Sequence, residues 1–300
     1  MPTIELNKIR KTYDHFVAVD DLSFKIEEGA VYGLLGPNGA GKTSTIRMMI
    51  GITVPDSGEI NMFGKPFVRR DLQRVGYLPE ERGLYKKMKI LDQLIFLGQL
   101  HGLDAKTARQ RSVAWSERME IADWLPKKVE ELSKGMQQKI QFIATLLHDP
   151  DFIVMDEPFS GLDPVNVVLL KNVLLELKAK GKTILFSTHQ MDTVEKLCDS
   201  ICLINHGKAV LQGELKQIKA NYGKNNVQIE YEGDGNFLAQ TKLVGSYNNY
   251  GNYVEVRLAP GADAQQLLHA VAERSRVNKF ELMEPSLEEI FIETVGKTDA

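Results

Sequence analysis

The chain has 300 residues, of which 43% are hydrophobic and 26% are charged, a composition typical of a globular protein with one large core and a smaller domain. Its 37 Lys and Arg residues against 40 Asp and Glu residues leave a formal net charge of -3, so no strong field attracts nucleic acid or anionic lipid. No stretch approaches the roughly 18 uninterrupted apolar residues that cross a bilayer, and residues 1–13 lack the apolar core of a signal peptide. We therefore expect a soluble chain that reaches a membrane only through a partner.

The chain has two cysteines, Cys198 and Cys202, which lie four residues apart. This spacing is not the CxxC of redox and zinc sites, and two cysteines are too few for a disulfide framework. We interpret them as small buried hydrophobic residues in a reducing cytoplasm.

The first half of the chain is predicted to contain a β-layer, then a unit of strand, loop and helix, and then a helical region. Alternating apolar residues between residues 3 and 30 predict antiparallel strands with a turn at Asp14-His15. The apolar run 30–35 is typical of a buried parallel strand, and a glycine-rich loop separates it from a helical stretch at 43–50. Apolar residues at three- and four-residue spacing then predict a helical region over 88–148.

Two more buried strands, 152–155 and 183–186, flank a predicted helix over 166–180 that ends at Gly181. Strands joined by helices indicate a mostly parallel sheet. Residues 221–226 are typical of a linker, and the alternating runs 227–231 and 253–257 predict half-exposed strands. We predict an α/β domain over 1–220, with an antiparallel β-layer and a helical subdomain over about 88–148, followed by a small α+β domain over 224–300.

The glycine-rich loop satisfies the P-loop pattern GxxxxGK[ST], and it follows an apolar strand and opens a helix as the motif requires. The glycines let successive backbone N–H groups point into one concavity, the lysine reaches the outer phosphates, and the threonine hydroxyl can bind Mg²⁺. The alternative is a tight turn kept for packing. The motif predicts a P-loop NTPase whose triphosphate contacts are Gly36, Pro37, Asn38, Gly39, Ala40, Gly41, Lys42, Thr43 and Ser44.

Two carboxylates, Asp156 and Glu157, follow the strand 152–155 at the sheet edge where a parallel α/β sheet places its ligand groups. We expect Asp156 to hold Mg²⁺ and Glu157 to accept a proton from the attacking water. The alternative interpretation is that both carboxylates cap the helix after Pro158.

The order of these motifs resembles the ATP-binding subunits of ABC transporters, and the resemblance covers roughly residues 3–220. In that family a short motif in the helical insertion completes the ATP site of the opposing subunit, and here Leu132-Ser133-Lys134-Gly135-Met136 occupies its place. This segment departs from the family's LSGGQ at Lys134 and Met136. The resemblance implies that Ser133 and Gly135 bind the γ-phosphate of the other subunit's ATP, and a simple helix cap is the alternative for Ser133.

Further positions carry the same resemblance. Ser160-Gly161-Leu162-Asp163 is similar to the family's D-loop, and Ser187-Thr188-His189 is similar to its switch histidine, which implies that His189 orients the water or the phosphate. Tyr13 lies where the family stacks an aromatic ring on adenine, although an isolated tyrosine can also be a packing residue.

Glu80 occupies the position of the family's Q-loop glutamine, and a carboxylate there still implies an Mg²⁺ ligand. The stretch Tyr77-Leu78-Pro79-Glu80-Glu81 and the ending 285–291 resemble a subgroup that drives ABC-2-type exporters, including sodium-extrusion and drug-efflux systems. We expect the segment from Glu80 to about Leu100 to receive the cytoplasmic helix of the membrane partner that the resemblance implies. Tyr85, Ile90 and Phe96 are candidate contacts there, with the helical core as the alternative, favoured for Phe96.

The resemblance implies an ATPase with ATP and Mg²⁺ as cofactors, a head-to-tail homodimer that closes over ATP, and an integral membrane permease as partner. It also implies a cytoplasmic location on the inner face of the cell membrane, through that partner. One rival is an ABC ATPase acting on the ribosome or on nucleic acid, but the chain has no second ATPase half, long coiled coil or zinc module. A second rival is a regulatory subunit that binds ATP without hydrolysing it. The presence of Lys42, Asp156, Glu157 and His189 argues against this second rival.

Overall fold

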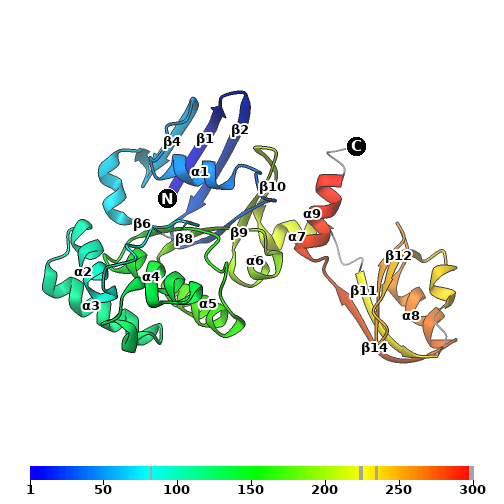
Figure 1. The fold of residues 1–300 in the computed structure, drawn as a ribbon. Coiled ribbons are helices and arrows are strands. Elements are labelled where there is room, and N and C mark those ends of the chain that lie inside the picture. Colours follow the sequence, from blue (N-terminus) through cyan, green and yellow to red (C-terminus); the bar gives the residue numbers. More distant parts are fainter. Residues whose placement is uncertain (82, 223–225, 234–235, 297–300) are drawn as a thin grey trace. The chain divides into compact units, whose positions relative to one another are not determined.

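The computed structural model describes residues 1–81, 83–222, 226–233 and 236–296. The chain divides into two compact units, Met1–Gly213 and Glu214–Ala300, and Figure 1 shows the elements of each. Residues 214–220, which we predict in the first domain, belong to the second unit. Part of the predicted linker, residues 223–225, lies outside the described residues. Among the helices described, none has the length and apolar character needed to cross a membrane.

An antiparallel sheet with strand order β2-β1-β4-β5 forms the β-layer of the first unit. Its first two strands meet at the turn predicted at Asp14-His15, and the apolar side chains that alternate along β1 and β2 are buried. Period-two burial is what a sheet with one covered face requires. The strands are β1 (Pro2–Tyr13), β2 (Phe16–Glu27), β4 (Ser57–Met62) and β5 (Lys65–Pro66).

A six-stranded sheet with order β10-β9-β3-β8-β7-β6 forms the second layer, and its strands from β9 to β6 run parallel. Every residue of β3, β7 and β8 is buried, as expected for strands covered on both faces. The predicted mostly parallel sheet is confirmed. The strands are β3 (Val31–Leu35), β6 (Val75–Leu78), β7 (Phe152–Asp156), β8 (Thr183–Thr188), β9 (Ser200–Asn205) and β10 (Lys208–Glu214).

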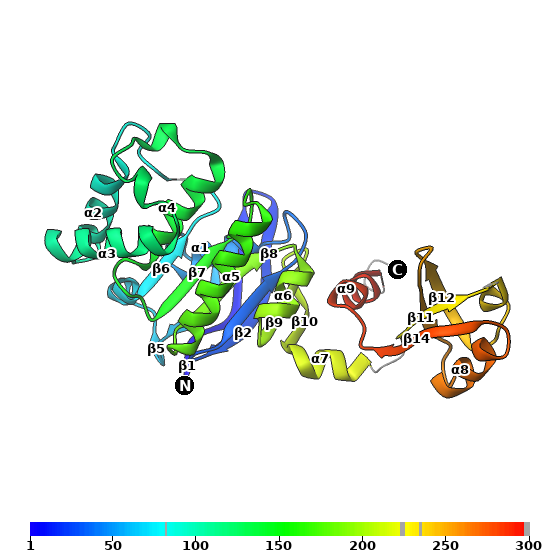
Figure 2. The ribbon, with the colours of Figure 1, turned by 90° about the horizontal axis from the view of Figure 1, so that it is seen from below.

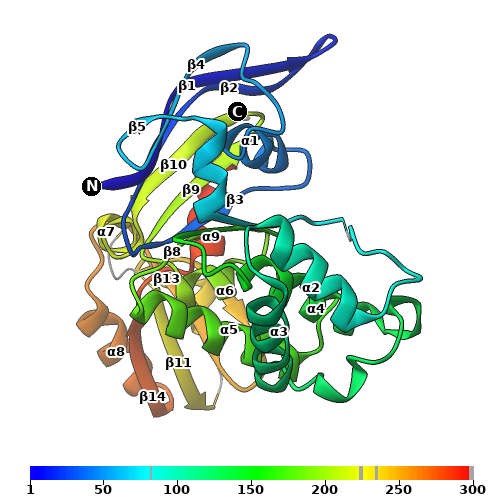
Figure 3. The same ribbon diagram turned by 90° about the vertical axis from the view of Figure 1, so that its left-hand side faces the viewer.

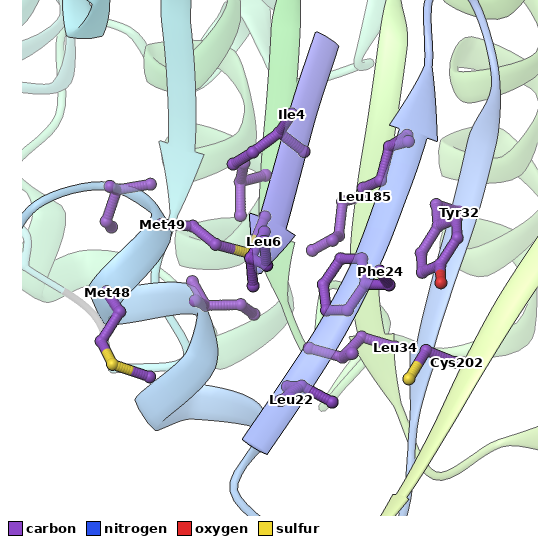
Figure 4. Packing of buried hydrophobic residues seen from close by; sticks show 14 of the residues in the cluster. Ile4, Leu6, Leu22, Phe24, Tyr32, Leu34, Met48, Met49, Leu185 and Cys202 are labelled. Carbon is purple, nitrogen blue, oxygen red and sulfur yellow. The ribbon is translucent and has the colours of Figure 1, made fainter. Parts of the chain in front are cut away.

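The main core lies between the two sheets. Figure 4 shows side chains of the antiparallel sheet and of the parallel sheet meeting those of helix α1 (Lys42–Met49). The Phe24 ring stacks on Tyr32 at 5.2 Å between centroids. On the parallel sheet's other side lie α5 (Pro164–Ala179) and α6 (Met191–Leu197), which Figure 2 shows alongside the strands. Cys202 is buried in the core, and burial raises its thiol pKa to about 12, as expected for an unreactive cysteine.

The helical insertion consists of α2 (Ile90–Leu100), α3 (Ala105–Arg118) and α4 (Lys134–Leu146), which Figure 3 shows packed side by side. The structure corrects one predicted partner contact here. Ile90 is fully buried and so belongs to the core, because the first turn of α2 faces inward. Phe96, for which a core position was favoured, is 37% exposed and contacts the exposed Tyr85 edge to face at 6.1 Å.

The described residues of the second unit form a four-stranded antiparallel sheet with order β12-β13-β11-β14 and three α-helices. Helix α8 covers one face, where Leu267 and Val271 meet Ile229 and the buried valines of the strands. This is an α+β arrangement. Its elements are α7 (Leu215–Tyr222), β11 (Asn226–Glu232), β12 (Val244–Asn249), β13 (Val254–Leu258), α8 (Ala264–Ala272), β14 (Arg276–Met283) and α9 (Leu287–Gly296).

A stacked histidine pair joins the helical insertion to the parallel sheet. The rings of His101 and His148 lie 3.9 Å apart, and His148 Nε2 lies 3.1 Å from the Val75 carbonyl oxygen. Burial, with a further contribution from His101, lowers the pKa of His148 to about 4, and burial also lowers the pKa of His101. Both rings therefore favour the neutral form in the folded state.

We expect this pair to make stability depend on pH. Between about pH 6.5 and pH 4 the His148 side chain binds a proton in the unfolded chain but stays neutral in the folded chain. The free energy of unfolding therefore falls as the pH falls through this range. The free energy of unfolding should drop by about 1 kcal/mol between pH 7.5 and 5.5. Urea unfolding at both pH values measures it. In the His148→Gln variant this part of the drop should disappear, and an unchanged drop would contradict the assignment.

Candidate active site

The loop between β3 and α1 wraps around the amino group of its own lysine. Lys42 Nζ donates to the carbonyl oxygens of Gly36 at 2.8 Å and Pro37 at 3.1 Å. Gly36 and Gly41 have φ values of 147° and 109°, which only glycine adopts without strain. The loop carbonyls thus hold the ammonium in place at the start of α1, where backbone N–H groups are free to meet an anion.

This loop borders a cavity of about 340 Å³. Ten of the residues predicted from the sequence line it, together with Phe16 and Ala18. Gly36, Pro37 and Ala40 belong to the same loop but are not among the lining residues. The predicted residues that line the cavity are Tyr13, Asn38, Gly39, Gly41, Lys42, Thr43, Ser44, Glu80, Asp156 and Glu157.

The electrostatics of the cavity balance one cation against three carboxylates. Burial lowers the pKa of Lys42, whereas the nearby charges of Glu157, Asp156 and Glu80 raise it. A phosphate would supply negative charge at the same ammonium and would favour its protonated form. The cavity therefore suits a phosphate group at Lys42 together with a bound cation that balances the three carboxylates.

Asp156 ends β7 directly opposite Ser187 of β8 in the parallel register. The Ser187 hydroxyl donates to Asp156 Oδ1, while Oδ2 is buried without a hydrogen-bond partner among the described residues. A buried carboxylate oxygen without a partner is costly unless a cation or an ordered water meets it. The carboxylate thus fits Mg²⁺ bound directly or through water. In the described part of the chain, no three His, Cys, Asp or Glu side chains form a metal site. Phosphate oxygens and the Thr43 hydroxyl would therefore have to supply the other ligands of such an ion.

Glu157 has a left-handed backbone, with φ of 48°, which is uncommon for a residue with a side chain. Its N–H donates to both the carbonyl oxygen and the hydroxyl of Ser187, at 3.2 and 3.1 Å. These bonds hold the strained turn. Its Oε1 lies 3.0 Å from Nδ1 of His189, which follows β8 and is 57% exposed. Glu157 is thereby aimed at the cavity with an imidazole beside its carboxylate.

Two aromatic rings also line the cavity. Tyr13 and Phe16 are cross-strand neighbours at the β1–β2 turn and are 39% and 61% exposed. A flat, partly exposed aromatic ring that lines the same cavity as a phosphate loop suits a nucleobase. Tyr13 is a predicted site residue, whereas Phe16 is not, although its position three residues later in the same hairpin was an available signal.

Ser133 and Gly135 are not among the residues that line this cavity. Ser133 is the N-cap of α4, and its hydroxyl accepts a hydrogen bond from the Met136 N–H at 3.3 Å. Within the single chain Ser133 therefore caps α4, and its contact with the ATP of an opposing subunit stays a prediction. Both Ser133 and Lys134 are exposed at the helix N-terminus, which leaves this end open to a second molecule.

The chain matches the family model described as "ABC transporter" over residues 19–160 and the model "ATP-binding protein DrrA1-3-like, C-terminal domain" over residues 213–295. It is 45% identical to the ABC transporter ATP-binding protein YhaQ of Bacillus subtilis, over 98% of both chains. The chain belongs to the ABC transporter ATP-binding protein family. It is also 38% identical to the Nod factor export ATP-binding protein I of Burkholderia pseudomallei, over 75% of this chain and 76% of the relative.

Among solved structures, the chain is similar to an ATP-binding subunit of an ABC transporter with a TM-score of 0.68 and 30% identity, over 74% of this chain and 93% of the other. It is also similar to CbiO1 of Clostridium perfringens, part of the transporter complex CbiONQ, with a TM-score of 0.65 and 26% identity over 73% and 91%. This ABC family member is an ATP-binding and ATP-hydrolysing subunit of a transporter, and the predicted P-loop NTPase fold is confirmed.

Proposed function

We propose that two copies of this chain close head to tail over two ATP molecules, and that closure drives a separate membrane permease in an exporter. The observation that carries the dimer is the position of Ser133 and Gly135. They lie at an exposed helix N-terminus outside the chain's own cavity, where backbone N–H groups suit an anion. An opposing copy would bring its γ-phosphate to this end.

Within each site the roles follow from the contacts. Lys42, freed from the loop carbonyls, binds the outer phosphates, and the P-loop N–H groups bind the others. Glu157 accepts the proton of the attacking water, and the His189 imidazole orients the carboxylate and the γ-phosphate. Tyr13 and Phe16 stack on adenine. Thr43, Asp156 and Glu80 are the proposed Mg²⁺ ligands, and the ion supplies neutralisation of the phosphate charge when bound.

The proposed permease contact is the segment from Glu80 to Leu100. Tyr85, Phe96 and Leu100 are 57%, 37% and 67% exposed, and the first two already contact each other. Exposed aromatic and apolar side chains of this kind suit contact with the apolar face of an amphipathic helix. ATP would bias the permease only as far as closure of the dimer changes this surface.

The exporter class is supported by the relative named for Nod factor export and by the match of the C-terminal unit to a model named for DrrA-like ATP-binding proteins. A net charge of -3 speaks against the rival that acts on nucleic acid or the ribosome. We place the subunit on the cytoplasmic face of the cell membrane, held there by its permease.

The experiment that tests this proposal is purification of the tagged chain from its native membranes in mild detergent. We expect a polytopic membrane protein near stoichiometry, and addition of that protein in lipid nanodiscs should stimulate ATP hydrolysis. Recovery of ribosomes or DNA-binding proteins, with no membrane protein, would refute the permease and leave the ATPase assignment standing.

A further inference from the structure

One face of α4 is polar where a buried helix face is normally apolar. Gln138, Gln141 and Thr145 recur at i, i+3 and i+7, so they point to the same side, and they are only 3%, 6% and 5% exposed. Burying amides and hydroxyls is costly unless they form hydrogen bonds. The partners of these three side chains therefore explain why the face is polar.

Each of the three side chains donates to a backbone carbonyl of a different segment of the nucleotide-binding unit. Gln138 Nε2 donates to the Pro158 oxygen at 3.2 Å, and Pro158 directly follows Glu157. Gln141 Nε2 donates to the Glu81 oxygen at 3.2 Å, and Glu81 directly follows Glu80. Thr145 Oγ1 lies 3.2 Å from the Tyr77 oxygen in strand β6 and 2.9 Å from the Gln141 oxygen one turn earlier in α4, so its one proton is shared between these two carbonyls. The assignment of the amide nitrogens follows from chemistry, because only the N–H end can donate to a carbonyl.

Helix α4 therefore touches three functional places at once. Its N-terminus carries Ser133, its next turn holds the loop after the proposed general base, and the following turn holds the loop that leads to the proposed permease contact. Loops without other secondary structure are held mainly by such side-chain bonds, and a rigid helix transmits a displacement along its whole length.

We infer that Gln141 is a positioning residue that couples the 79–89 segment to the Ser133 end of α4, with Gln138 forming the corresponding link to the loop after Glu157. The inference rests on the proposed function, because it assigns a role in communication between the permease surface and the opposing ATP site. When ATP draws the Ser133 end toward the other copy, α4 carries the Glu81 carbonyl with it, and a permease that moves this loop biases closure in return.

The energetics favour a role beyond stability. Gln141 Oε1 is buried without a hydrogen-bond partner among the described residues, so the amide retains an unmet acceptor at this position. A leucine of similar volume would remove that cost together with the bond to Glu81. The Glu81 carbonyl oxygen loses its donor, but Glu81 is exposed, so water can replace the amide there. The Gln141→Leu variant should therefore stay close to the parent in stability, and urea unfolding separates loss of coupling from loss of folding.

The test uses the full chain in a Glu157→Gln background, in which ATP should hold the dimer closed. Hydrogen exchange is followed with and without ATP in peptides covering residues 79–89 and 133–138. We expect ATP to slow exchange in both peptides of the parent. In the Gln141→Leu variant the effect should persist at 133–138 and fall by about fivefold or more at 79–89.

Thr145→Val is the matched control, because it removes only the hydroxyl that bonds the Tyr77 and Gln141 carbonyls and leaves the bonds to Glu81 and Pro158 in place. It should keep the ATP response of both peptides. The inference is overturned if Gln141→Leu retains the response at 79–89, or if Thr145→Val loses it equally. If the parent forms no ATP-dependent dimer in size-exclusion chromatography, the proposed function fails and the inference with it. If the parent dimerises but ATP does not slow exchange at 79–89, the inference alone is refuted.

Discussion

Replacing Glu157 with glutamine should lower kcat for ATP hydrolysis by about 10²- to 10⁴-fold while leaving ATP binding intact, because an amide cannot accept the proton of the attacking water. The strained backbone at Glu157 and its bonds to Ser187 depend on main-chain atoms, so the substitution keeps the geometry of the site. Unhydrolysed ATP should then accumulate in a dimer. Steady-state hydrolysis, nucleotide binding and size-exclusion chromatography with ATP measure the three consequences.

The matched control is Glu81→Gln. Glu81 is exposed and is not among the residues that line the cavity, and its link to Gln141 uses the backbone oxygen that the substitution retains. This variant should hydrolyse ATP within about twofold of the parent. Steady hydrolysis by Glu157→Gln at the parent rate would show that another group removes the proton, and His189 beside it would be the next residue to replace.

Replacing Gly36 with alanine should abolish ATP binding and destabilise the fold by at least about 3 kcal/mol, since it combines backbone strain with a clash. A Cβ at this position would lie 2.2 Å from the Ile204 carbonyl oxygen, and the φ of 147° is accessible only to glycine. The Gly36 oxygen also accepts the Lys42 ammonium, so any shift of the loop displaces the cation. Urea unfolding and calorimetric titration with ATP would measure both effects.

Gly39→Ala, in the same loop, separates strain from collision. Gly39 also has a positive φ, of 81°, but a Cβ there meets no atom within 4 Å. We expect a cost of about 1 kcal/mol, from the left-handed backbone alone. Equal destabilisation by the two variants would mean that backbone conformation, and not the approach of Ile204, makes glycine necessary at Gly36.

Much of the nucleotide site could be predicted from local sequence. A strand, a glycine-rich loop and a helix start depend on neighbouring residues, so the run from Gly36 to Ser44 indicated both the geometry and the anion. Asp156 and Glu157 were placed correctly near this loop because parallel strands end at one sheet edge. The roles of these residues remain predictions, which the Glu157 and Gly36 variants test.

Other features needed the assembled chain. Ser187 joins Asp156 and the Glu157 N–H only because β7 and β8 pair in one particular register, and register between strands 30 residues apart is a tertiary property. The same holds for the reversed roles of Ile90 and Phe96, since three- and four-residue spacing marks an apolar face without showing which residue at its border is covered.

Residue spacing was enough to predict the strand, loop and helix unit and the alternation of buried strands with helices, because these depend on a few consecutive turns or strand positions. Which distant groups meet depends instead on the packing of the whole chain. The bonds from Gln138 to Pro158 and from Gln141 to Glu81 join residues 20 and 60 positions apart. Such contacts follow from how α4 packs on the sheet, and no local pattern encodes that packing.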